Sequence, residues 1–150
     1  MTTDTDTFTF ERSFDLPPEK LWHLLTAPEA REIWGAPNDE TVLETLSADF
    51  TPGGTERHRC GPKEAPEFEV TTRWYHIDAP QKVTFTEQIH AGGTTLGASL
   101  VTYALTPTAK GTDLSVVVAV ASFVGPGMVA DFRDGWTGGL AQLDKLVASL

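Results

Sequence analysis

The sequence predicts an α+β protein in which a curved antiparallel sheet wraps around one long C-terminal helix, with two short helices after the first strand. Three observations carry this prediction. Residues 128–150 carry an apolar stripe at helical spacing, seven segments have the composition of β-strands, and short turns join most of them. Consecutive strands joined by short turns must pair antiparallel. A bulky helical stripe needs a large apolar surface to cover it, and a curved sheet provides one.

The C-terminal helix is predicted from apolar residues that recur in steps of three and four. They are Met128, Phe132, Trp136, Leu140, Leu143, Leu146, Val147 and Leu150. Gly135, Gly138 and Gly139 interrupt this stretch, and each costs about 1 kcal/mol relative to Ala in a helix interior. The glycines therefore indicate that backbone faces something at this level, either the sheet in close packing or space left for a ligand.

The N-terminal part is predicted to contain one strand and two short helices. The strand covers residues 8–14, where apolar or aromatic and polar residues alternate. Asp15 is the expected N-cap of the first helix, with a proline in its first turn. Thr26 is the expected cap of the second helix, which ends near Trp34.

The other strands are separated by turns rich in glycine and proline. They are predicted at residues 42–50, 55–60, 68–77, 83–89, 96–105 and 112–123. Trp74 and Ile77 both have the character of inward-facing residues, and their spacing of three predicts a β-bulge in the fourth strand.

Length and composition predict one domain over residues 1–150, of which 1–7 form a short polar N-terminal tail. The net charge of -10 argues against nucleic acid or an anionic membrane as a partner. The single cysteine, Cys60, excludes an internal disulfide and fits a reducing cytoplasm. The sequence has no Cys/His cluster at zinc spacing, no signal-peptide pattern and no apolar run long enough to span a bilayer, so we expect a cytoplasmic protein without metal or cofactor.

Several stretches resemble a known family in their order and spacing. They are Phe10-Glu11-Arg12-Ser13-Phe14, Pro18-Glu19-Lys20-Leu21-Trp22, Pro28-Glu29, Ile33-Trp34-Gly35, Asp49-Phe50-Thr51-Pro52-Gly53-Gly54, Ile77-Asp78-Ala79-Pro80, Gly111-Thr112-Asp113-Leu114, and Gly135-Trp136 with Leu140 and Leu143. Together they resemble the START and birch-pollen-allergen (SRPBCC) superfamily, and within it the subgroup named for the activator of the heat-shock protein 90 ATPase. The resemblance implies a helix-grip fold. It also implies one of several functions, which include apolar-ligand carriage, polyketide cyclisation and a chaperone co-factor role.

The function of such a fold would sit between sheet and helix, so the direction of each side chain matters. Alternation along the strands predicts which residues point inward. They are Val83, Phe85, Glu87 and Ile89 in the fifth strand, Val101, Tyr103 and Leu105 in the sixth, and Leu114, Val116, Val118 and Val120 in the seventh. In the third strand Arg57 and Arg59 are assigned to solvent. Glu56, His58 and Cys60 then face inward, where the family usually places apolar residues.

The inward positions of Glu56, His58 and Glu87 are the unusual feature of the sequence. A carboxylate taken out of water costs several kcal/mol unless it is paired or neutralised. These three residues, with Arg73 if it faces inward, are candidates for binding a polar group on an apolar ligand. The alternatives are a structural network among themselves or a wet end of the sheet.

The predicted ligand is a small apolar or aromatic molecule held between sheet and helix. The candidate binding residues are Trp34, Glu56, His58, Trp74, Phe85, Glu87, Tyr103, Phe132 and Trp136. The aromatic members of this set can equally be plain core. A cyclase- or hydrolase-like enzyme that uses Glu56, His58 and Glu87 as acid–base groups, and a chaperone co-factor domain, are the alternative functions. The oligomeric state stays open, a homodimer included.

Overall fold

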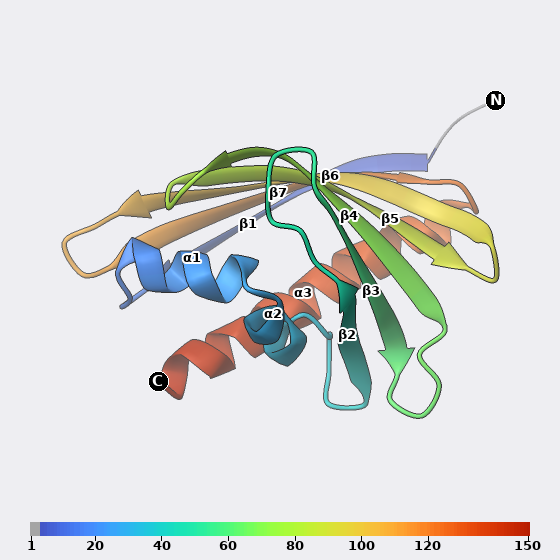
Figure 1. Cartoon of the computed structure of the whole chain (residues 1–150), viewed down its shortest axis with the longest axis horizontal. Helices are drawn as coiled ribbons and strands as arrows, with labels where there is room; N and C mark the ends of the chain where they lie inside the picture. The colour runs from blue at the N-terminus through green and yellow to red at the C-terminus, as the bar shows by residue number, and fades with distance from the viewer. Residues whose placement is uncertain (1–3) are drawn as a thin grey trace.

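The computed structural model describes residues 4–150 and has the predicted order of elements (Figure 1). The helices are α1 (Pro18–Thr26), α2 (Pro28–Trp34) and α3 (Pro126–Ala148). The strands are β1 (Asp4–Phe14), β2 (Thr41–Ser47), β3 (Thr55–Pro62), β4 (Phe68–Asp78), β5 (Lys82–Ala91), β6 (Thr94–Pro107) and β7 (Thr112–Ser122). No helix among the described residues is long and apolar enough to cross a membrane.

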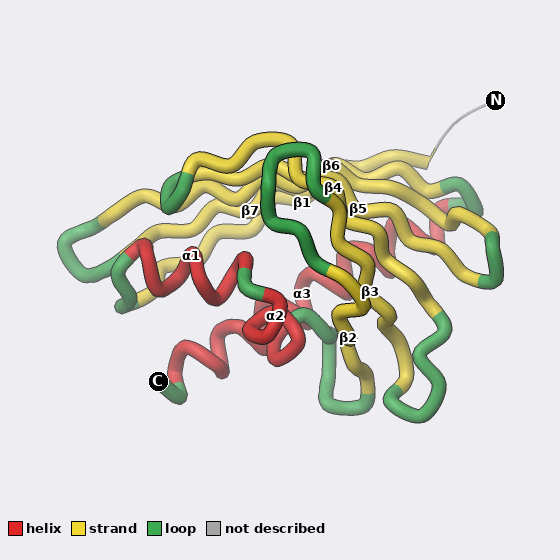
Figure 2. The backbone as a smooth tube through the Cα atoms, viewed as in Figure 1, coloured by secondary structure: helices red, strands yellow, loops and turns green. Residues whose placement is uncertain are grey.

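The seven strands form one antiparallel sheet in the order β1-β7-β6-β5-β4-β3-β2. Strand β1 pairs with β7 along its whole length, from Asp4 opposite Ser122 to Phe14 opposite Thr112. Every other neighbouring pair is consecutive in sequence, as short turns require. Helix α3 runs across the concave side of the curved sheet, and α1 and α2 lie on the same side (Figure 2). The predicted helix-grip architecture is therefore confirmed.

The core lies between the concave face of the sheet and the helices. The predicted inward residues of β6 and β7 are all buried, as are Val83 and Phe85 in β5. From α3, Phe132, Leu140 and Leu143 are buried against this surface. Alternation along a strand was sufficient to predict these orientations, because the period of two leaves only one other choice.

The two short helices begin differently from the prediction. Pro17, not Asp15, is the N-cap of α1, and its extended backbone leads directly into a helix that starts with Pro18. Thr26 does not cap α2, because its hydroxyl donates a hydrogen bond back to the carbonyl of Trp22 at 2.8 Å. Ala27 occupies the cap position instead, without a side-chain hydrogen bond.

The two strand boundaries that differ most from the prediction are the start of β1 and the end of β2, and both adjoin segments that bond to a distant strand. Residues 4–7, assigned to the polar tail, belong to β1 because they pair with residues 119–122 of β7. The remainder of that tail lies outside the described residues. Strand β2 ends at Ser47 rather than at residue 50. The loop after it hydrogen-bonds to β4 instead, where Trp74 bonds through its backbone to Gly53 and Gly54. The predicted bulge in β4 is present between Trp74 and His76.

Candidate functional site

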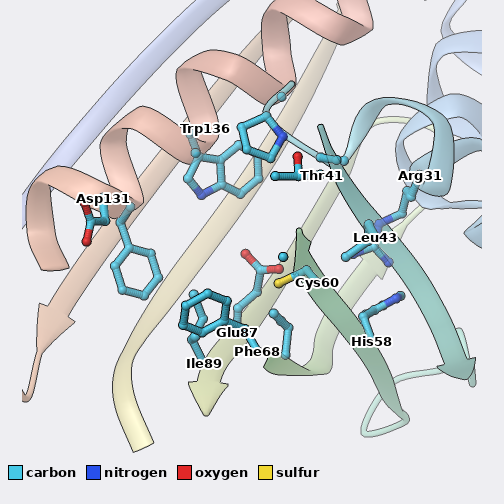
Figure 3. Close-up of a pocket in the computed structure, with 18 of the residues that line it drawn as sticks. Arg31, Thr41, Leu43, His58, Cys60, Phe68, Glu87, Ile89, Asp131 and Trp136 are labelled. Carbon is cyan, nitrogen blue, oxygen red and sulfur yellow. The ribbon is translucent and has the colours of Figure 1, made fainter. Parts of the chain in front are cut away.

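A cavity of about 430 Å³ lies between the concave face of the sheet and the first half of α3 (Figure 3). This volume is within the range of small-molecule sites, which is roughly 300–1,000 Å³. Its wall is mostly apolar. It is formed by Arg31, Trp34, Gly35, Ala36, Pro37, Thr41, Leu43, His58, Cys60, Gly61, Pro62, Phe68, Val70, Glu87, Ile89, Tyr103, Met128, Asp131, Phe132, Gly135, Trp136 and Gly139.

The glycines of α3 explain why space remains under this helix. A Cβ atom on Gly138 would lie 2.6 Å from the carbonyl oxygen of Pro37, so the helix packs closely on the segment after α2. A Cβ on Gly135 would meet nothing within 4 Å, and Gly135 lines the cavity. Close packing and open space therefore both occur within one turn. The close contact is made with the segment after α2, not with the sheet.

A buried polar network includes two residues of the cavity wall, Arg31 and His58. Arg31 of α2 donates a hydrogen bond from Nη1 to Glu56 Oε1 at 2.5 Å, and both side chains are buried, at 7% and 0% exposure. His58 Nε2 lies 3.2 Å from the same oxygen, and His58 Nδ1 lies 3.2 Å from the hydroxyl of Thr45. Burial opposes ionisation of Glu56, but the His58 hydrogen bond and the Arg31 charge together hold its pKa below the ordinary value.

Glu87 supplies a carboxyl group to the cavity from the sheet. It comes from β5, two residues beyond the buried Phe85, and Figure 3 shows its carboxyl pointing into the drawn pocket. No ion pair found among residues 4–150 includes Glu87. Burial raises the pKa of Glu87, and the charges of Arg31 and His58 only partly offset that effect. The cavity thus contains a carboxyl group that the protein leaves without a counter-charge.

Two other ionisable groups on the wall are held in their neutral forms. Burial, with a contribution from Glu87, raises the pKa of the Cys60 thiol to about 11. Burial likewise raises the pKa of the Tyr103 phenol. Cys60 is therefore a poor nucleophile at neutral pH, since the thiolate is the reactive form. Among residues 4–150, His, Cys, Asp and Glu form no group of three or more that could hold a metal ion.

A chain of ring contacts connects the cavity with α1. The rings touch in the order Trp136, Tyr103, Phe85, Trp74, Phe50 and Trp22, with centroid separations of 4.7–6.2 Å. Tyr103 and Trp136 line the cavity, whereas Phe85 and Trp74 lie behind it. Most of these pairs have the edge-to-face geometry that aromatic quadrupoles favour.

Six of the nine candidate residues lie on the cavity wall. They are Trp34, His58, Glu87, Tyr103, Phe132 and Trp136. Trp74 and Phe85 are at most 1% exposed and belong to the aromatic core, and Glu56 lies in the polar network beside Arg31. The binding role of all nine stays a prediction.

Sequence reasoning missed Arg31 and considered Arg73 in its place. Arg73 is exposed, and its guanidinium lies 5.6 Å from the ring of Tyr75 on the outer surface. Arg31 is buried next to Trp34 on the inner face of α2, three residues earlier in the chain. The signal was available, because residues three apart on a helix share a face and Trp34 had been placed at the cavity.

Comparison with known proteins agrees with this architecture. Residues 15–148 match the family described as activator of Hsp90 ATPase homolog 1-like protein. A search of curated proteins gives no match. A solved structure from Rhizobium loti is 28% identical, with a TM-score of 0.83 and coverage of 100% of both chains.

Two further structures have the same fold. A protein from Rhodobacter sphaeroides is 26% identical, with a TM-score of 0.77 over 96% of this chain and 93% of its own. The AHSA1 protein from Silicibacter pomeroyi is 21% identical, with a TM-score of 0.76 over 95% and 98%. The family match covers most of the sequence and the structures agree with it in fold, so the chain belongs to the activator of Hsp90 ATPase homolog 1-like family of the SRPBCC superfamily.

Proposed function

We propose that the protein binds a small, largely apolar or aromatic molecule in the cavity under α3. The observation that carries this proposal is the composition of the wall, where aromatic and aliphatic side chains surround the Glu87 carboxyl group, which forms no ion pair among residues 4–150. Small-molecule sites have this composition, with apolar walls and a few placed polar groups. Family membership supports the same function, because proteins of this superfamily generally bind hydrophobic ligands.

Acid–base catalysis by Glu56, His58 and Glu87 together is less favoured by the geometry. Glu56 is outside the cavity wall, and its Oε1 atom already accepts hydrogen bonds from Arg31 and His58. A general base must reach the proton that it removes, directly or through one water. The three residues therefore do not form one catalytic set around the cavity, and a binding function accounts better for their arrangement.

A thermal-shift screen with lipids, flavonoids and polyketide-like aromatic compounds tests the proposal. At a concentration about 100 times its Kd, a ligand adds about 2.7 kcal/mol of stability, which corresponds to roughly 5–10 °C in Tm for a domain of this size. Absence of any stabilising compound from the panel would count against a binding function.

A cavity-filling variant distinguishes binding in the cavity from binding elsewhere. Gly135→Leu places a side chain in the open space of the cavity and should abolish the thermal shift. Gly127→Leu is the matched control, because Gly127 lies on the same helix, also has nothing within 4 Å of a Cβ atom, and does not line the cavity. A shift that persists in Gly135→Leu would place the ligand outside this cavity.

A further inference from the structure

A row of polar side chains crosses the inner face of the sheet at the level of the cavity. Glu56 of β3 is opposite Thr72 of β4, Thr72 is opposite Glu87 of β5, and Glu87 is opposite Ser99 of β6. Residues directly opposite one another in an antiparallel sheet point to the same face, with Cβ atoms about 4.5–5.5 Å apart. Glu87 therefore has a hydroxyl-bearing neighbour on each side.

Both hydroxyl groups beside Glu87 are buried and unused. Thr72 is 0% exposed and Ser99 is 3% exposed, and neither side-chain oxygen has a hydrogen-bond partner among the described residues. A buried hydroxyl without a partner is unfavourable by roughly 1–3 kcal/mol. Thr72 and Ser99 are the direct cross-strand neighbours of Glu87, and Thr72 is also opposite Glu56. Each hydroxyl therefore has an unused donor beside a carboxyl group on the same face of the sheet.

The charges on the wall favour one kind of polar group on the ligand. Arg31, which carries a positive charge, is already neutralised by Glu56 at 2.5 Å. Glu87 has no such partner among residues 4–150, and Asp131 of α3 adds a second carboxyl group to the wall. An anionic group on a ligand would meet the Glu87 and Asp131 carboxylates, while Arg31 and His58 already contact Glu56. A cationic group would find its counter-charge at Glu87.

We propose that the cavity selects an organic cation: a protonated primary or secondary amine with an apolar or aromatic body, whose ammonium group binds to Glu87. Thr72 and Ser99 are positioning residues that hold the carboxylate. The body of the ligand packs against Tyr103, Trp136 and their neighbours, whose ring faces also attract a cation. This inference rests on the proposed function and names its ligand class.

The electrostatics of Glu87 are consistent with an amine ligand. Its raised pKa reflects burial first, and Glu56 adds to the effect while Arg31 and His58 reduce it. The other ionisable groups on the wall are Arg31, His58, Cys60, Tyr103 and Asp131. Arg31 and His58 both lie within hydrogen-bond distance of Glu56, so neither pairs its positive charge with Glu87. A bound ammonium group would supply that charge and would favour the ionised form of Glu87.

Three probes of matched shape test the inference: 2-(1-naphthyl)ethylamine, 2-(1-naphthyl)ethanol and 1-naphthylacetic acid. Their affinities are measured by isothermal titration calorimetry at neutral pH and low salt. We expect the amine to bind at least about 10-fold more tightly than the alcohol, a difference of about 1.4 kcal/mol, and the acid to bind most weakly. Glu87→Gln should remove the preference for the amine while the alcohol still binds.

A matched variant controls for net charge. Glu64→Gln removes the same charge from an exposed loop position that does not line the cavity, and should keep the preference for the amine. Equal affinity of the amine and the alcohol for the native protein, or a preference that persists in Glu87→Gln, would overturn the inference and leave the binding function standing. Failure of all three probes to bind, combined with a panel that gives no thermal shift, would count against both.

Discussion

Glu87 is placed where its ionised form is unfavourable, and this has a measurable effect on stability. Because its pKa is raised in the folded protein, its contribution to stability is complete below the ordinary value of 4.5 and is lost as pH rises through the folded-state pKa. Glu87→Gln removes this loss. We therefore expect the variant to be more stable than the native protein at pH 8, with a difference that shrinks toward zero near pH 4.

Urea unfolding at a series of pH values measures this difference. The control is Glu64→Gln, whose exposed position gives no reason for such a pH dependence. A Glu87→Gln variant that is less stable than the native protein at pH 8 would show that the native carboxylate is stabilised by a counter-charge.

Arg31 and Glu56 form a buried ion pair, and we expect it to stabilise the protein only while both partners are present. Removing one partner from a buried ion pair leaves an uncompensated charge and typically costs about 3–5 kcal/mol. We expect Arg31→Met to lose stability on this scale, and Arg31→Met/Glu56→Leu to recover much of it. Arg57→Met tests the dependence on burial. The Arg57–Glu69 pair is also 2.5 Å long but about half exposed, so its loss should cost less than about 1 kcal/mol.

Chemical denaturation of the four proteins at neutral pH measures these values. Glu56 adds a pH dependence of opposite sign to that of Glu87. Its lowered pKa means that its stabilisation is present above pH 4.5 and is lost as pH falls through the folded-state value. Equal losses from Arg31→Met and Arg57→Met would contradict the distinction between buried and exposed pairs.

At the level of single residues, the sequence predicted direction better than partnership. The inward orientation of Glu56, His58 and Glu87 follows from alternation alone, which local sequence encodes. That Arg31 pairs with Glu56, 25 residues later, depends on how α2 docks on β3, and neither segment encodes this docking locally. The separation of Glu87 from that pair has the same origin.

Among the elements, α3 has one glycine in close contact with its neighbour and one beside the cavity, and substituting each of them tests this difference. Gly138→Ala would place a methyl group 2.6–2.8 Å from Pro37 and should destabilise the protein, since the backbone segment must move. Gly135→Ala meets no atom within 4 Å and should stabilise it by up to about 1 kcal/mol through helix propensity. Thermal unfolding of the two variants measures both signs, and a stabilised Gly138→Ala would refute the close contact.

The elements themselves were largely predictable, and the errors lie at their ends. Periodicity identified all ten helices and strands among residues 4–150. The cap of α1 and the start of β1 were wrong for different reasons, one local and one distant. Pro17 already has the extended conformation that a cap needs, and Asp4 is ordered by pairing with Ser122. Distant pairing of this kind leaves no trace in a short window of sequence.

On the scale of the whole molecule, the first strand pairs with the last, and this pairing holds the sheet and helices together as one unit. Pairing of the first strand with the last means that residues 4–14 cannot detach without exposing the inner edge of β7. The salt bridge from Arg12 of β1 to Asp144 of α3 connects the same strand with the helix that covers the cavity. A ligand under α3 therefore contacts a structure whose parts are mutually constrained.

The chain of rings from Trp136 to Trp22 connects the cavity with α1, so we expect ligand binding to change amide hydrogen exchange in α1. A ligand that immobilises Trp136 restricts Tyr103 and, ring by ring, the side chains as far as α1, which does not line the cavity. Deuterium uptake by α1 should then slow on ligand binding. Phe50→Leu removes one ring and should abolish the protection of α1 while that of α3 persists. Protection confined to the lining segments of the native protein would mean that the rings transmit nothing over this distance.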